Sequence, residues 1–134
     1  MSVTAIKSTP APRRVGSWVL QGIVASAFFA AGAAKLAGAA YMIQLFDQIG
    51  IGQWFRYATG TVEVIGAAAL LAPGLIALGG TLLGTTMIFA TLTHLFVLHT
   101  SPAPAIVLGV LNALIVYLRR DEIAYFTRVL TKVL

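Results

Sequence analysis

Apolar residues occur in four long runs along this chain, and polar residues gather between and beyond the runs. An α-helix of about 20 residues rises roughly 30 Å, which is the thickness of the hydrocarbon core of a bilayer. The runs therefore predict membrane-spanning helices at residues 15–35, 57–72, 75–98 and 103–118. Pro73 and Gly74 mark the turn between the second and third helices, and residues 99–102 form the next turn.

Polar segments flank the predicted helices at both ends. Residues 1–14 contain Pro10 and Pro12 and are predicted to form a disordered cytoplasmic leader. Basic residues before an apolar run also resemble a signal peptide, but this run exceeds the roughly 7–15 apolar residues of such a peptide. A retained helix is the favoured interpretation, with cleavage as the alternative. Residues 121–134 are predicted to form a basic amphipathic tail on the cytoplasmic membrane surface.

The connection between the first two predicted helices, residues 36–56, has a mixed pattern. The apolar residues that can share one face of a short helix are Met42, Ile43, Leu45, Phe46 and Ile49, and they are interrupted by Gln44, Asp47 and Gln48. Trp54 and Tyr57 are typical of the aromatic belt at the membrane–water boundary. The segment is predicted to lie along the membrane surface, and a surface loop without fixed structure is the alternative.

The charge content supports a bilayer environment. The 134 residues are 59% hydrophobic and 10% charged, with a mean hydropathy of +0.93, whereas about a quarter of a soluble domain is charged. Of the nine basic residues, the seven in the two tails are Lys7, Arg13, Arg14, Arg119, Arg120, Arg128 and Lys132. The positive-inside rule places both tails in the cytoplasm. The predicted fold is an all-α, integral membrane four-helix up-down-up-down bundle over residues 15–120, with an interfacial segment between its first two helices.

Composition also excludes several activities. Basic residues beside apolar runs indicate contact with anionic membrane lipid rather than with nucleic acid. The chain has no cysteine, which excludes a disulfide, thiol redox chemistry and a Cys-ligated zinc or iron–sulfur site on this chain. No Ser-His-Asp arrangement or phosphate-binding glycine loop occurs. Catalytic residues therefore stay unknown, and the chain is not predicted to be an enzyme on its own.

Polar residues inside the predicted helices are the candidates for ligand binding or proton handling: Lys35, Glu63, His94 and Asn112. Charged groups within a membrane cost about 2.5–3.5 kcal/mol each on insertion scales, so a function is the default hypothesis. Glu63 lies about 9 Å deep, level with Lys35 and His94, and Asn112 lies nearer the middle. The group predicts either a small polar pocket open to the outer side or a buried staple that orients three helices. One histidine and one carboxylate are too few for a dedicated metal site.

Three stretches together resemble the DoxX family of bacterial membrane proteins. They are AAGAAKLAG at residues 30–38, FDQIGIGQWFRYATGTVEVIGAAALLAP at 46–73, and ATLTHL at 90–95. The family pattern has a lysine closing the first helix, a G-x-x-E-x-x-G core in the second, and a polar or histidine position late in the third. These positions are Lys35, Gly60-Glu63-Gly66 and His94 here, and the resemblance covers about residues 18–119.

This resemblance implies a function in general terms. Members are associated with membrane redox complexes and with resistance to oxidative stress, and the name comes from a subunit of a thiosulfate:quinone oxidoreductase. The chain is then expected in the bacterial inner membrane, either as a non-catalytic subunit of such a system or as a component that binds a quinone-like molecule. Its expected partners are membrane lipid and either a partner protein or further copies of itself. The alternative is a small proton-coupled transporter that uses Glu63.

Overall fold

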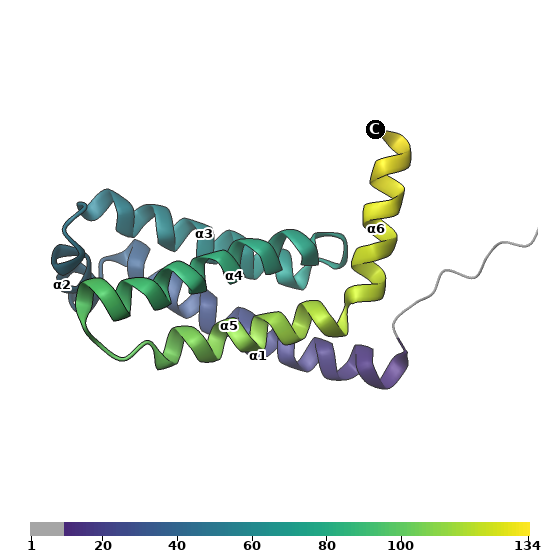
Figure 1. Ribbon diagram of the computed structural model, residues 1–134, viewed down its shortest axis with the longest axis horizontal. Coiled ribbons are helices and arrows are strands. Elements are labelled where there is room, and N and C mark those ends of the chain that lie inside the picture. The colour runs from purple at the N-terminus through teal and green to yellow at the C-terminus, as the bar shows by residue number, and fades with distance from the viewer. Residues whose placement is uncertain (1–9) are drawn as a thin grey trace, which may run out of the picture.

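The computed structural model describes residues 10–134, and over this range every long element is a helix. The helices are α1 (Ala11–Ala37), α2 (Ala40–Ile49), α3 (Gln53–Leu71), α4 (Ile76–Thr93), α5 (Ala103–Leu118) and α6 (Arg120–Val133). A short 3-10 turn, Pro73–Leu75, precedes α4, and a π-helical turn, His94–Leu98, follows it. Figure 1 shows α1, α3, α4 and α5 alongside one another, with α2 at one end and α6 across the other.

The first helix begins earlier than the sequence pattern predicted. The disordered leader was expected to reach residue 14, but α1 starts at Ala11; residues 1–9 lie outside the described part of the chain. Pro12 falls in the first turn of α1, where a proline is tolerated because the N–H it lacks would have no helical partner. The prolines therefore mark the start of this helix rather than a segment without structure.

Glycines in the left-handed region end α1 and α2 and prepare the start of α3. Gly38, Gly50 and Gly52 have φ values of +73°, +81° and +112°, which glycine adopts without the steric cost of a Cβ. The short helix α2 therefore occupies only part of the predicted interfacial segment 36–56. The third helix starts at Gln53 rather than at residue 57, because the chain turns at Gly50–Gly52 and not at the aromatic belt.

The core lies where α1, α3, α4 and α5 meet. Its fully buried apolar side chains include Phe28 of α1, Leu70 of α3 and Leu83 of α4. Gly79 of α4 lies directly against the backbone of α3, since a Cβ there would be 2.8 Å from the carbonyl oxygen of Gly66 and 2.8 Å from the amide nitrogen of Leu70. Close approach of helix backbones through small residues is typical of packing in membranes, where van der Waals contacts rather than the hydrophobic effect hold helices together.

Two described helical segments, Ala11–Ala37 and Pro73–Leu98, are long and apolar enough to cross a membrane. A third is added if α5 and α6, which bend by 67° at their junction, count as one broken span. The helix α5 alone has 16 residues, and α3 carries Arg56 and Glu63, which lower its hydropathy. Large apolar side chains, such as Phe89 and Phe96, are exposed on the outside of the bundle, as expected where lipid replaces water.

Candidate functional site

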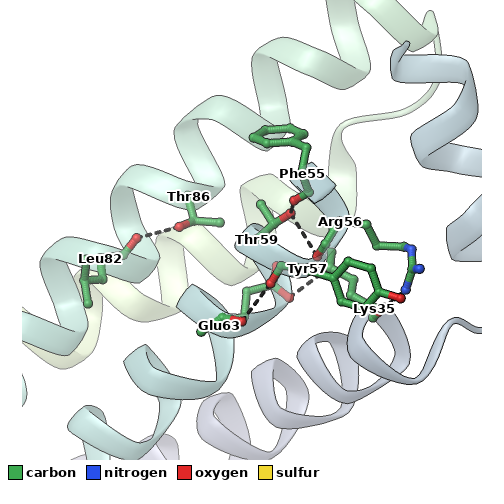
Figure 2. A network of polar contacts seen from close by, with 9 residues as sticks. Lys35, Phe55, Arg56, Tyr57, Thr59, Glu63, Leu82 and Thr86 are labelled. Atoms are coloured by element: carbon green, nitrogen blue, oxygen red, sulfur yellow. Dashed lines mark hydrogen bonds and ion pairs between the residues drawn. The ribbon is translucent and has the colours of Figure 1, made fainter. Parts of the chain in front are cut away.

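Lys35, near the end of α1, and Glu63, in the middle of α3, point toward each other and form an ion pair (Figure 2). The Lys35 Nζ atom lies 2.9 Å from Oε2 and 3.1 Å from Oε1 of Glu63. The exposed fractions of the two side chains are 11% and 4%. A charge so deeply buried needs a partner, and each of these groups supplies one to the other. The structure thus brings together two of the four candidate residues.

The glycines around Glu63 explain how this contact forms. A Cβ at Gly60 would lie 3.0 Å from the Lys35 Cβ and 3.1 Å from the carbonyl oxygen of Gly32, and a Cβ at Gly32 would lie 2.9 Å from the carbonyl oxygen of Gly60. The two glycines therefore let α1 and α3 approach one turn from the ion pair. Gly66 serves the other neighbour of α3, since its Cβ would meet Leu83 of α4 at 2.7 Å. The two glycines of the G-x-x-E-x-x-G pattern thus let α3 pack closely against α1 on one side and against α4 on the other.

Arg56 is a second buried charge at this end of the bundle, and the sequence pattern placed it only at the end of the predicted interfacial segment 36–56. Its guanidinium donates through Nη1 to the carbonyl oxygen of Lys35 and through Nε to Gln53 Oε1 at 2.6 Å. Gln53 in turn donates to Asp47 Oδ1 at 2.7 Å. Because the last carbonyls of a helix lack partners within it, Arg56 caps α1 and ties it to α3 (Figure 2).

His94 does not join the ion pair. Its Nδ1 atom lies 2.7 Å from Thr100 Oγ1, and the backbone N–H of Thr100 donates to the carbonyl oxygen of His94 at 2.9 Å. No hydrogen bond within residues 10–134 connects His94 to Glu63. The π-helical turn His94–Leu98 ends at His99, which has a φ of +52°, and this reversal brings Thr100 back to His94. The His94 side chain therefore stabilises the turn that precedes α5.

Asn112 lies apart from the ion pair, at a groove between α4 and α5. The groove has a volume of about 510 Å³, and its lining is mainly apolar. The lining residues are Gly80, Thr81, Gly84, Met87, Ile88, Thr91, Ala105, Ile106, Gly109, Val110, Asn112, Ala113 and Val116. Asn112 Nδ2 donates to the carbonyl oxygen of Gly80 at 2.9 Å, whereas its buried Oδ1 has no partner within residues 10–134. A buried acceptor without a donor is costly, and this atom belongs to one of the few polar residues of the groove lining.

A second polar cluster, which we call the Arg119 cluster, lies at the opposite end of the bundle. Arg119 donates from Nε to Ser17 Oγ at 2.9 Å, and its Nη1 lies 2.9 Å from both carboxylate oxygens of Glu122. Ser17 donates to Gln21 Oε1 at 2.7 Å, and Gln21 donates to the carbonyl oxygen of Leu70. These contacts tie α1, α3, α5 and α6 together. The pattern of charges predicted Arg119 only as a basic flanking residue.

What these clusters can do chemically differs. The Lys35–Glu63 pair is closed around its own hydrogen bonds, and the Arg119 cluster is closed except for the buried Nη2 of Arg119, which has no partner within residues 10–134. Both sets of contacts orient helices. The groove at Asn112 offers a mainly apolar wall of a size suited to a small ligand, and its lining includes Asn112, whose buried Oδ1 has no partner within residues 10–134. Among residues 10–134, no three His, Cys, Asp or Glu side chains gather as metal ligands would.

The helices and their polar clusters define an all-helical membrane protein with a lysine–glutamate pair between its first and third helices. The sequence profile of the DoxX-like family matches residues 19–118, and the chain belongs to this family. A search of the curated proteins finds no match, and a search of the solved structures finds none either.

Proposed function

We propose that this DoxX-like protein crosses the bacterial inner membrane four times and binds a small hydrophobic molecule as a non-catalytic component of a membrane assembly. The four crossings are α1, α3, α4 and α5, and both ends lie in the cytoplasm. Support comes from the basic residues of the two tails and from the turn at residues 99–102, which carries none. Trp54 and Tyr57, both exposed at the start of α3, suit the outer membrane boundary.

The observation that carries the binding function is the groove between α4 and α5. Membrane-facing grooves with few polar groups take ligands that partition into the bilayer. Asn112 is part of the groove lining, and in this proposal its buried, unpartnered Oδ1 gains a donor when the amide group turns toward the bound ligand. Glu63 is not part of the groove lining, so the ion pair acts in this proposal as a structural contact.

The family resemblance implies a quinone-like ligand, and the groove suits the reduced form of such a molecule, the quinol, better than its oxidised form. The unpartnered Asn112 Oδ1 is an acceptor, so it pairs with a ligand hydroxyl and not with a carbonyl oxygen. The hydroxyls of Thr81 and Thr91 in the lining already donate to carbonyl oxygens of their own helix, at 2.7 and 2.8 Å. The hydroxyl-bearing quinol therefore suits the groove better than the oxidised quinone.

A transporter that moves protons through Glu63 has less support. Such a site has to exchange protons with both sides of the membrane. Glu63 is instead held by both of its oxygens on Lys35, at the place where Gly32 and Gly60 bring α1 and α3 together.

Native mass spectrometry of the protein purified in mild detergent tests the binding function. The wild type is expected to retain a small molecule, and Asn112→Leu and Ala113→Trp are expected to lose it. The first variant removes the acceptor, and the second fills the groove from an exposed lining position. Glu63→Gln is the matched control and should retain the molecule. Retention by both groove variants, or an empty wild type that copurifies with another protein, would overturn the binding function.

A further inference from the structure

The helix α6 leaves the bundle at an angle and carries an apolar face that the bundle only partly covers. It bends by 67° from α5 and runs across the end of the other helices (Figure 1). Phe126, Val129, Leu130 and Val133 follow the i, i+3, i+4, i+7 spacing of one helix face. Their exposure rises along the helix, from 39% at Phe126 to 78% at Val133.

One contact shows which way this face points. The ring of Phe126 lies beside the turn between α3 and α4, where a Cβ at Gly74 would be 3.8 Å from its Cε1 and Cζ atoms. The face that carries Phe126 therefore looks back toward the bundle. Val129, Leu130 and Val133 continue the same face beyond the edge of the bundle, where hydrocarbon would lie if the bundle crosses a membrane.

The charges of α6 are arranged to leave its polar side basic. Its two acidic residues are neutralised within the fold, because Asp121 pairs with Arg13 and Glu122 pairs with Arg119. Within residues 10–134, neither Arg128 nor Lys132 forms an ion pair. These two basic residues are four apart and lie on a side of the helix away from Val133.

We propose that α6 is an interfacial helix that docks on the anionic phospholipid of the cytoplasmic leaflet. Its apolar face enters the boundary of the acyl chains, and Arg128 and Lys132 contact lipid phosphates. The Arg119 cluster holds α6 at the 67° bend from α5, which turns the helix away from the bundle axis and toward the membrane plane. This inference rests on the membrane placement proposed above and is independent of the groove.

Spin labels on the full-length protein in vesicles test this inference. Because the chain has no cysteine, Val133→Cys and Thr131→Cys each give one labelling site, on the apolar and the polar side of α6. The label at 133 is expected to collide more with oxygen and less with a water-soluble nickel complex than the label at 131. The contrast should be greater in phosphatidylcholine with one quarter phosphatidylglycerol than in phosphatidylcholine alone.

Charge variants test the lipid preference. In the Val133→Cys protein, Arg128→Gln with Lys132→Gln should lower the ratio of docked to undocked helix in the anionic vesicles, by roughly fivefold for each residue. Thr127→Gln with Thr131→Gln is the matched control, because it changes polar positions on α6 without changing charge, and it should leave the ratio unaltered. Equal ratios in the charge variant and the wild type overturn the lipid preference.

Flotation of the vesicles separates this inference from the membrane placement itself. Protein that floats with the vesicles but gives equal nickel accessibility at positions 131 and 133 overturns the docking of α6 alone. Protection of position 133 that rises with the protein-to-lipid ratio overturns it as well, since a second copy would then cover the face.

Discussion

Lys35 and Glu63 form the buried contact whose loss is easiest to interpret. Removing one partner of a buried ion pair leaves the other charge without compensation, at a cost of about 3–5 kcal/mol. We expect Lys35→Met to lower the free energy of unfolding by about 3 kcal/mol. The double variant Lys35→Met with Glu63→Leu should recover more than half of that loss. Denaturation in mixed micelles, followed by tryptophan fluorescence, measures both changes.

The matched control for this pair is Lys132→Met, at an exposed lysine of α6, which should change stability by less than about 0.5 kcal/mol. The coupling free energy between Lys35 and Glu63 decides whether their contact stabilises the fold. If the losses from Lys35→Met and Glu63→Leu simply add, the contact contributes no mutual stabilisation, and its role as a structural staple is wrong.

At the same scale, only part of the candidate site could be predicted from sequence. Lys35 and Glu63 share a depth in the bundle, and that depth alone was enough to suggest their contact. Arg56 lies seven residues before Glu63 and therefore on the same face of α3, a signal that its place near the predicted loop concealed. Nothing local indicates that Ser17 and Arg119, 102 positions apart, meet, because that contact depends on how α1 packs against α5.

At the scale of the elements, two helical glycines distinguish the effect of close helix packing on stability from the effect of helix propensity. A Cβ at Gly79 meets backbone atoms of α3, which cannot rotate away, whereas one at Gly22 meets nothing within 4 Å. We expect Gly79→Ala to destabilise the protein by about 2 kcal/mol, as overpacking does. Gly22→Ala should stabilise it by up to about 1 kcal/mol, because alanine favours the helix. Thermal unfolding of the two variants in the same detergent measures the difference, and equal shifts would contradict the packing of α3 on α4.

Element boundaries were harder to predict than the elements themselves. The apolar runs indicate where helices lie, but α1 extends to Ala11 because a proline in the first turn does not interrupt a helix. Similarly, α3 starts at Gln53 because the glycines before it make the turn. His94 shows the same limit, since its depth matched that of Glu63 while the π-helical turn directs it to Thr100 instead.

At the scale of the whole molecule, the number of membrane crossings decides on which sides of the membrane the two ends of the chain lie. The segments Ala11–Ala37 and Pro73–Leu98 qualify by length and hydropathy, and α5 with α6 qualifies only as one bent span. Three crossings would place the ends of the chain on opposite sides of the membrane, and four would place them on the same side. The contacts of α3 favour four, because its Gly60 and Gly66 pack against α1 and α4 along their lengths.

Single cysteines decide between these topologies, because the chain has none of its own. Ala11→Cys, Ser101→Cys and Thr131→Cys replace exposed residues near the start of α1, between α4 and α5, and in α6. With four crossings, a membrane-impermeant maleimide added to spheroplasts should label position 101 and reach positions 11 and 131 only after permeabilisation. Three crossings would put 11 and 131 on opposite sides, so that one of them reacts before permeabilisation and the other does not. The positive-inside rule favours the first result, because basic residues lie at both ends and the turn at residues 99–102 has none.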